Sequence, residues 1–557
     1  MKEYIISIET VKIKDFLFST NKLQCIQGAS FQLDYLNTHC MNKIFKKFNI
    51  KYTSLSFRDL DNLYNKDPKN FSNNIFEKIK DADVFYNAAG NSKFKFKVEN
   101  EDLLNDLIKE IKLLYYHLAP GAKIVIHKKE IKEKDKYSEI ISNLSKETAI
   151  MKNIGLGILN EDLVILKKCN LSGNELAEFS EKNIDNIKEI LKTDSTYIYS
   201  EILNSILESL DLNLLKKHIK ELVGSSTYYI SRETLMKLIF SIRGKTSDNT
   251  FYNSLLENLQ KANFNLKIEE FADSKQFIGF VYSDGDGLGD YIKTKTLACN
   301  TNEDNANEDY EKFIKTFSIM LDYITKSSII DALKNIYSNK DNKKIGSVLI
   351  AGGDDFCALF NPIDAINIVK NYHTFFEKKA KILGLKITSS TGLLFVKHKV
   401  PIHLMFEKAL VLQKSAKQKR HIEKIQDSGY IDFQNIGSQG NVNIFNYRNG
   451  KDNVSKRAYK TNDFISLLNK ILNIKCLNFP TNKLRRFYEI KSNKNINIPQ
   501  QNMKILNYLF KLDENIIYSL VDKNLLENIN KNILNSTQEL CPDILDIIEL
   551  YSFMEVL

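Results

Sequence analysis

One order of strand and helix patterns, β-α-β-β-α-β, occurs twice in the sequence and restricts the fold more than any other feature. Alternating apolar residues predict the strands, and apolar residues at helical spacing predict the helices. This order is typical of ferredoxin-like, or palm, domains. The first copy is expected as strands at 4–11, 84–90, 92–98 and 122–129 with helices at 29–48 and 101–118. The second is expected as strands at 276–284, 344–353, 356–360 and 386–396 with helices ending near 337 and at 362–383, extended by a helix at 401–420 and a strand at 429–436.

Helical apolar spacing dominates the chain between the two copies and after the second one. With 557 residues, the chain is too long for a single core. The sequence therefore predicts an α+β protein with two palm domains, a helical linker domain and a C-terminal helical domain. The expected domains are a first palm domain at 1–165, a helical linker domain at 166–270, a second palm domain at 271–445 and a C-terminal helical domain at 446–557.

The composition is that of a soluble globular protein, with 43% hydrophobic and 27% charged residues. No apolar run reaches about 18 residues and no signal-peptide core is visible, so we expect a cytoplasmic protein without a membrane partner. The seven cysteines contain no CxxC pair, which argues against bound zinc. A basic excess between Lys451 and Lys504 suits an RNA or protein partner, or an ordinary solvated surface.

The second copy carries two adjacent aspartates in the turn between its second and third strands, in AGGDDF. Tight turns alone explain Gly352 and Gly353. Asp354 and Asp355 are different, because adjacent carboxylates repel each other unless protons or cations neutralise them. A bound metal ion would account for both residues.

A second acidic segment, SDGDGLGD, follows the first strand of the same copy. The first and third strands of a ferredoxin-like sheet are neighbours, so Asp284 is expected to approach the Asp354–Asp355 turn. Carboxylate oxygens suit Mg²⁺ or Mn²⁺, and two such ions could activate a hydroxyl group and hold a triphosphate. Gly285, Gly287 and Gly289 leave room for phosphates at the start of the next helix.

Two other interpretations of SDGDGLGD were weighed. An EF-hand loop is excluded, because Leu288 and Lys295 would stand at ligand positions. A glycine-rich turn without a function is the remaining alternative.

Together these motifs resemble the large, cyclase-type subunit of type III CRISPR effector complexes of the Csm and Cmr kinds, whose palm is related to GGDEF cyclases and polymerases. The resemblance covers nearly the whole chain. The matching segments are FSTNKLQCIQGAS, FYNAAGNSKFKF, SDGDGLGD, AGGDDF, STGLLFVKHKVPI, KALVLQKSAK and NKLRRFYE.

The resemblance implies a role for individual residues. Asp284, Asp354 and Asp355 would be catalytic and, together with Asp286, would hold two Mg²⁺ or Mn²⁺ ions. Nucleotide binding would involve Gly287, Gly352, Gly353, Ser390 and Lys417. The alternative for Lys417 is a solvated lysine in a basic run.

In the first palm, Gly90 and Asn91 replace the acidic turn. They would bind a second nucleotide without metal chemistry, or form only a hairpin. The sequence departs from many family members in two further ways. None of its eight histidines is followed by aspartate and the first expected strand starts at residue 4, so we expect no HD-type DNase. Residues 170–270 contain no cysteine for the zinc site that is usual between the palms.

The reaction implied by the resemblance joins ATP into 3′-5′ cyclic oligoadenylates when guide RNA pairs with target RNA, as part of antiviral defence. Other type III subunits and both RNAs would be partners. The alternatives are an idle scaffold subunit, a free-standing signalling cyclase, or a synthase that joins AMP to another acceptor such as S-adenosylmethionine. A template-directed polymerase is disfavoured, because no finger and thumb domains are visible.

Overall fold

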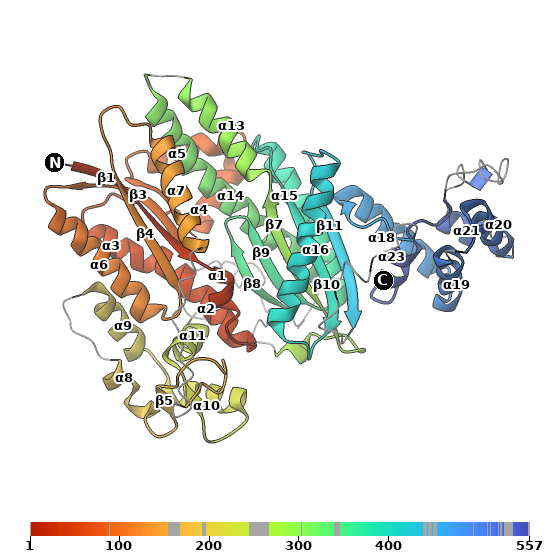
Figure 1. The fold of residues 1–557 in the computed structure, drawn as a ribbon, viewed down its shortest axis with the longest axis horizontal. Coiled ribbons are helices and arrows are strands. Elements are labelled where there is room, and N and C mark those ends of the chain that lie inside the picture. The colour runs from red at the N-terminus through yellow and green to blue at the C-terminus, as the bar shows by residue number, and fades with distance from the viewer. Residues whose placement is uncertain are drawn as a thin grey trace.

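The computed structural model describes most of the chain. The described residues are 2–88, 90–153, 167–191, 197–243, 267–301, 304–338, 346–437, 443, 448, 454–493, 495–509, 511–512, 514–521, 523, 526–527 and 539–554. Two sheets with their helices lie side by side, and the C-terminal helices form one end of the molecule (Figure 1). Among the described residues, no helix combines the length and apolar character that crossing a membrane requires.

The first sheet has the ferredoxin-like order β2-β3-β1-β4, with all neighbouring strands antiparallel. One of its two inner strands, β1, has three consecutive apolar residues from Tyr4 and is buried from Tyr4 to its end. The strands are β1 (Lys2–Val11), β2 (Val84–Ala88), β3 (Asn91–Val98) and β4 (Lys123–Glu130). The strand order predicted for this copy is confirmed.

Helices pack on the first sheet and connect its strands. The expected helix at 29–48 begins earlier, at Leu23, and contains one π-helical turn. The helices are α1 (Ile13–Leu17), α2 (Leu23–Tyr35), η1 (Leu36–Cys40), α3 (Met41–Lys47), α6 (Glu101–Leu118) and α7 (Tyr137–Asn153).

Two helices that the sequence analysis did not predict precede β2, namely α4 (Phe57–Lys66) and α5 (Phe71–Ile79). Ser56 starts α4 with a capping box, in which its hydroxyl accepts from the Asp59 amide. Apolar side chains of both helices, including Phe71, pack into the core of the second palm rather than the first. This insertion therefore joins the two palms.

The second sheet has the order β12-β11-β10-β7-β9-β8. Its first four strands in the chain are antiparallel neighbours in the ferredoxin-like order, and β11 then pairs parallel to β10. The strands are β7 (Phe277–Asp286), β8 (Ser347–Gly352), β9 (Asp355–Phe360), β10 (Thr388–Lys397), β11 (Tyr430–Gly437) and β12 (Tyr459–Lys460). The α+β class and the palm order predicted for this copy are confirmed.

Each face of the second sheet is covered by helices. On one face Val281 and Phe356 belong to the same core as α14 (Ala306–Tyr337) and α15 (Pro362–Ile382). On the other face Tyr282 and Cys357 pack with α16 (Ile402–Ile422) and with α2 of the first palm. The remaining helix of this domain, α13 (Leu288–Asn300), follows β7. The first palm thus forms part of the cover of the second sheet.

The linker region is mostly helical, with a small two-stranded sheet that the sequence analysis did not predict. Its elements are β5 (Phe179–Ser180), η2 (Ile184–Asn186), α8 (Ile187–Ile190), α9 (Ile198–Glu208), α10 (Leu212–Val223), β6 (Tyr229–Ile230), α11 (Arg232–Arg243) and η3 (Ile268–Glu270).

The C-terminal region packs on the second sheet, with the Phe553 and Phe395 rings stacked at 4.4 Å between centroids and with Glu549 accepting from Gln434 at 3.0 Å. Its helices are α18 (Thr461–Cys476), α19 (Thr481–Ser492), α20 (Ile498–Leu509), α21 (Glu514–Leu520) and α23 (Ile544–Tyr551). The expected domain boundaries at 165–166 and 445–446 lie outside the described residues, so the division into four domains stays a prediction.

Candidate active site

The ends of β7 and β9 bring the predicted carboxylates to one edge of the second sheet. Ser283 of β7 pairs with Phe356 of β9 in an antiparallel ladder. Asp284, the residue after Ser283, and Asp355, the residue before Phe356, therefore lie at the same end of these two strands. The approach is close at Gly285, since a Cβ atom there would lie 2.8 Å from the Cβ atom of Asp354. Contacts between elements far apart in the sequence therefore define this site.

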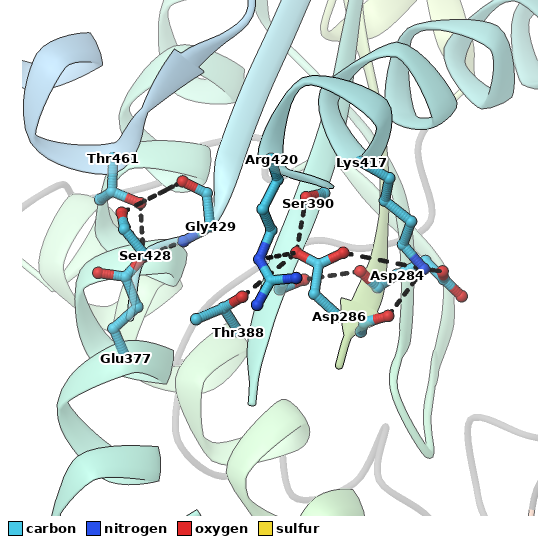
Figure 2. Close-up of polar contacts among 12 residues, drawn as sticks. Asp284, Asp286, Glu377, Thr388, Ser390, Lys417, Arg420, Ser428, Gly429 and Thr461 are labelled. Carbon is cyan, nitrogen blue, oxygen red and sulfur yellow. Dashed lines mark hydrogen bonds and ion pairs between the residues drawn. The ribbon is translucent and has the colours of Figure 1, made fainter. Parts of the chain in front are cut away.

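Asp284 is held by two side chains of α16. Lys417 forms an ion pair with its Oδ2 atom, and Gln413 Nε2 donates to the same atom at 3.3 Å. The Lys417 ammonium also donates to the Gly285 carbonyl at 2.7 Å. Figure 2 shows Lys417 extending from α16 toward Asp284 and Asp286. Lys417 is thus a partner of the acidic cluster, and its binding to a nucleotide stays a prediction.

Asp286 is almost fully buried beneath Asp284, with 3% of its surface exposed. Ser390 Oγ donates to its Oδ2 atom at 2.6 Å, and Thr388 Oγ1 does so at 3.3 Å. Arg420 Nε lies 3.7 Å from the same oxygen (Figure 2). Burial nevertheless raises the pKa of Asp286 above its ordinary value. Asp286 is thus held by side chains of β10 and α16, and its supporting role in metal binding stays a prediction.

Ser390 was predicted to bind the nucleotide from the strand beside it. The structure places this fully buried side chain on Asp286, and its binding to a nucleotide stays a prediction. The strand register explains this position, because Ser390 pairs with Asp284 across the β7–β10 ladder. Gly392 on the same strand allows α16 to pack closely, since a Cβ atom there would lie 2.1 Å from the Ala409 carbonyl oxygen.

Asp354 and Asp355 are partly buried, and their surroundings disfavour ionisation of both carboxylates. Burial raises the pKa of Asp355 to about 7, and the negative charges of Asp354 and Asp284 add to this effect. Burial and the charge of Asp284 also raise the pKa of Asp354. Tyr282 donates its hydroxyl proton to Asp355 Oδ1 at 2.7 Å. The site thus holds more negative charge than its own side chains neutralise.

A residue that the sequence analysis missed fixes the turn itself. The Gly353 amide donates to Asp322 Oδ1 of α14 at 2.9 Å, and Gly353 has a left-handed φ of 59°. Lys326, one turn further along α14, forms an ion pair with Asp322 at 2.8 Å. The only sequence signal for this arrangement is the Asp-x-x-x-Lys spacing on a buried helix, which does not name its partner.

The donor set fits a hard divalent ion, because it consists of carboxylate oxygens with excess negative charge. Within the described part of the chain, however, no three His, Cys, Asp or Glu side chains are gathered as a ready metal-binding group. Two of the carboxylates already have partners, Lys417 on Asp284 and Tyr282 on Asp355. Metal binding by Asp284, together with Asp354, Asp355 and Asp286, would therefore use its Oδ1 atom, or its Oδ2 atom after Lys417 moves away.

The predicted nucleotide-binding glycines lie at backbone positions next to these carboxylates. Gly287 precedes α13 in the left-handed region, with φ of 75°. Gly352 ends β8 and pairs with Asp355. The start of α13 therefore adjoins the acidic edge of the sheet, and a helix start favours anions.

In the first palm, Gly90 and Asn91 are tied to the end of β1. The Gly90 carbonyl accepts from the Thr10 amide at 3.0 Å and from the Thr10 hydroxyl at 2.6 Å. The Asn91 side chain also accepts from the Thr10 amide, at 3.3 Å. These bonds attach the turn between β2 and β3 to the end of β1. Nucleotide binding at this turn stays a prediction.

Residues 277–426 match the family model of the second palm domain of Cas10/Cmr2. The Cas10/Cmr2 match spans β7 to α16 and therefore contains every carboxylate described above as well as Lys417. It confirms the resemblance to type III CRISPR subunits that the motifs indicated. No curated protein sequence matches the chain.

Solved structures of Csm1 share the fold of the whole chain. A Csm1–Csm4 cassette in complex with cA4 matches with a TM-score of 0.54 and 12% identity, over 100% of this chain and 70% of that chain. Csm1 from T. onnurineus matches with a TM-score of 0.53 and 13% identity, over 99% and 70% of the two chains. A Csm1–Csm4 cassette in complex with AMPPNP matches with a TM-score of 0.53 and 12% identity, over 99% of this chain and 70% of that chain. At such low identity the similarity concerns the fold.

Proposed function

We propose that this chain is a nucleotidyltransferase of the Cas10 kind, which joins ATP molecules into cyclic oligoadenylates with 3′-5′ linkages. The observation that carries this proposal is the meeting of Asp284, Asp354 and Asp355 at one edge of a sheet whose sequence matches the Cas10/Cmr2 second palm. Structures of similar fold are described as complexes with ATP, pppApA, cA3 and cA4, which supports this substrate and these products.

The reaction would be a displacement at the α-phosphate of ATP. The 3′-hydroxyl oxygen of one nucleotide would form a bond to the α-phosphorus and lose its proton to water, while the bond to the oxygen that bridges to the β-phosphate breaks and pyrophosphate leaves. Mg²⁺ or Mn²⁺ bound by the four aspartates would supply positive charge for the phosphates and activate the hydroxyl. Repeating the step and then closing the ring gives the cyclic product.

The chain's own residues would position the donor. Lys417 can exchange Asp284 for a phosphate oxygen, since an ammonium group serves either anion. The amides at the start of α13 and the glycines at 287, 352 and 353 allow phosphates to approach the backbone. In the first palm, the hairpin at Gly90 and Asn91 would hold the acceptor nucleotide, and proximity would contribute much of the rate acceleration.

The partners follow from the same comparison. The similar Csm1 chains occur with Csm4, so we infer that this chain also works beside other type III subunits. Guide RNA and target RNA, and a cytoplasmic location, belong to the same proposal.

Mass spectrometry of the products tests the proposal. The full chain, alone and assembled with partner subunits, guide RNA and target RNA, is incubated with ATP and Mn²⁺, with and without S-adenosylmethionine. Cyclic oligoadenylates are expected, and they should disappear in an Asp354→Asn/Asp355→Asn variant but not in Asp102→Asn, an exposed aspartate on α6. A product that joins AMP to the added acceptor would instead identify a different synthase, and no product under any condition would favour a scaffold subunit.

A further inference from the structure

A lysine of the first palm reaches the carboxylate cluster of the second. Lys14 of α1 donates to the Tyr282 hydroxyl at 2.5 Å, and Tyr282 in turn donates to Asp355 Oδ1 at 2.7 Å. The direction of these two hydrogen bonds is fixed, because an ammonium group can only donate. The Tyr282 oxygen must accept from Lys14, so its own proton is directed to Asp355.

Aromatic packing around Tyr282 and Lys14 holds these two hydrogen bonds in one arrangement. Tyr282 is 1% exposed, and its ring packs edge-on against Phe406 with 5.1 Å between centroids. The Lys14 ammonium lies 4.5 Å from the centroid of the Tyr282 ring and 5.5 Å from that of Phe406. Removing Lys14 would leave a buried phenol without its donor and Asp355 without a positive charge that favours its ionised form.

The same short segment is attached to the hairpin of the first palm. Thr10 binds both Gly90 and Asn91, and Lys12 then turns the chain into α1 with a left-handed φ of 53°. The Ile13 side chain also contacts the hairpin, 3.4 Å from the position that a Cβ atom on Gly90 would take. Residues 10–14 therefore run from the first-palm hairpin to the second-palm carboxylates.

We propose that Lys14 and Tyr282 are positioning residues, through which the docked first palm orients Asp355 for divalent cation binding. With Oδ1 committed to Tyr282, Oδ2 is the oxygen left to face the cation. This inference rests on the proposed function, because it concerns the same metal site. Groups that orient a metal ligand typically change metal affinity or activity about 10- to 100-fold when they are removed.

The test is the affinity of the full chain for Mn²⁺ without ATP, measured by isothermal titration calorimetry. Tyr282→Phe and Lys14→Met should each weaken Mn²⁺ binding by roughly 10-fold or more. Because the two residues act in series, the double variant should bind no more weakly than Tyr282→Phe alone. Lys14→Arg keeps the charge and should recover most of the affinity. Lys12→Met, at an exposed position two residues away, is the matched control.

The outcomes separate this inference from the proposed function. If Asp355→Asn abolishes Mn²⁺ binding while Tyr282→Phe and Lys14→Met bind like wild type, the positioning role is wrong and the metal site stands. If the losses of Mn²⁺ binding free energy in the two single variants add up in the double variant, Lys14 does not act through Tyr282. If wild type binds no Mn²⁺, the metal site of the proposed function fails, and the positioning role fails with it.

Discussion

Lys417 of α16 and Asp284 at the end of β7 form an ion pair, and the same ammonium group donates to the Gly285 carbonyl at 2.7 Å. A side-chain cation thus already neutralises part of the acidic cluster. A divalent ion that binds the Oδ2 atom of Asp284 must compete with this lysine, which then becomes available for phosphate. Lys417 therefore has two roles that can be separated by experiment.

Replacing Lys417 with methionine should change metal binding and turnover in opposite directions. Mn²⁺ affinity should rise, because Asp284 loses its competing partner. Oligoadenylate formation should fall about 10- to 100-fold, since a hydrogen bond to a charged group contributes roughly 1.5–3 kcal/mol. Calorimetry and product quantification measure the two effects, with Lys414→Met on the same helix as control. Lower Mn²⁺ affinity in Lys417→Met would contradict the competition.

The raised pKa of Asp355 predicts a pH-dependent effect of metal on stability. Its folded-state pKa of about 7 exceeds the value of an unfolded aspartate, so its contribution to stability is lost as pH rises through 7. A divalent ion binds the ionised carboxylate and offsets this loss. The increase in melting temperature on adding Mn²⁺ should therefore be larger at about pH 8 than at about pH 6. Asp355→Asn should remove most of this difference, and an equal increase at both pH values in wild type would contradict the account.

Gly285 and Gly289 form a matched pair for a steric test. A Cβ atom on Gly285 would lie 2.8 Å from Asp354 Cβ and 2.8 Å from Leu288 Cδ1, so Gly285→Ala should displace Asp354 and reduce product formation at least tenfold. Among the described residues, none lies within 4 Å of a Cβ atom built on Gly289. Gly289→Ala, at the second residue of α13, meets no atom of the described part of the chain and leaves Asp354 in place, so it should keep much more activity than Gly285→Ala and add up to about 1 kcal/mol of stability. Equal activities of the two variants would show that the close approach at Gly285 is unimportant.

His373 of α15 predicts a loss of stability in acid. It is buried between Thr391 and Thr461, its Nε2 atom lies 2.7 Å from Thr391 Oγ1, and burial lowers its pKa to about 3. A lowered histidine pKa costs stability as pH falls below the unfolded value of 6.5. Between pH 6.5 and about pH 5, this residue should cost about 2 kcal/mol of unfolding free energy.

The pH dependence of the wild-type protein alone cannot isolate His373, because nearby Glu377 changes the unfolding free energy in the opposite direction as pH falls. Glu377 accepts from Thr461 and from the Gly429 amide (Figure 2), and burial raises its pKa. Urea unfolding of wild type and His373→Gln at several pH values isolates the histidine. The two proteins should differ in their pH slope between pH 6.5 and 5, and parallel curves would contradict a neutral buried histidine.

Local patterns were sufficient to predict both palms, because strand alternation and turn residues are encoded within each segment. The acidic edge could also be predicted, since the neighbouring first and third strands follow from the ferredoxin-like order. The insertion of α4 and α5 was missed although Ser56 and Asp59 show a capping-box spacing. Its packing on the second palm depends on tertiary contacts that no local pattern contains.

Tertiary contacts also explain the residues at the site that the sequence analysis missed or placed differently. Asp322 binds the Gly353 amide from a helix whose orientation follows only from packing. Lys14 meets Tyr282 only because the two palms dock. The register of β7 and β10 directs Ser390 to Asp286, a contact that the sequence analysis did not predict. A single sequence does not name the partner residue in any of these three relationships.

The most direct test of the central claim is pyrophosphate release from ATP by the assembled complex, measured for wild type and for Asp354→Asn and Asp355→Asn separately. The account predicts one pyrophosphate for each phosphodiester bond formed by wild type, and a loss of at least about 100-fold in each variant. Release at the wild-type rate by either variant would show that the paired aspartates of the β8–β9 turn do not carry out the chemistry.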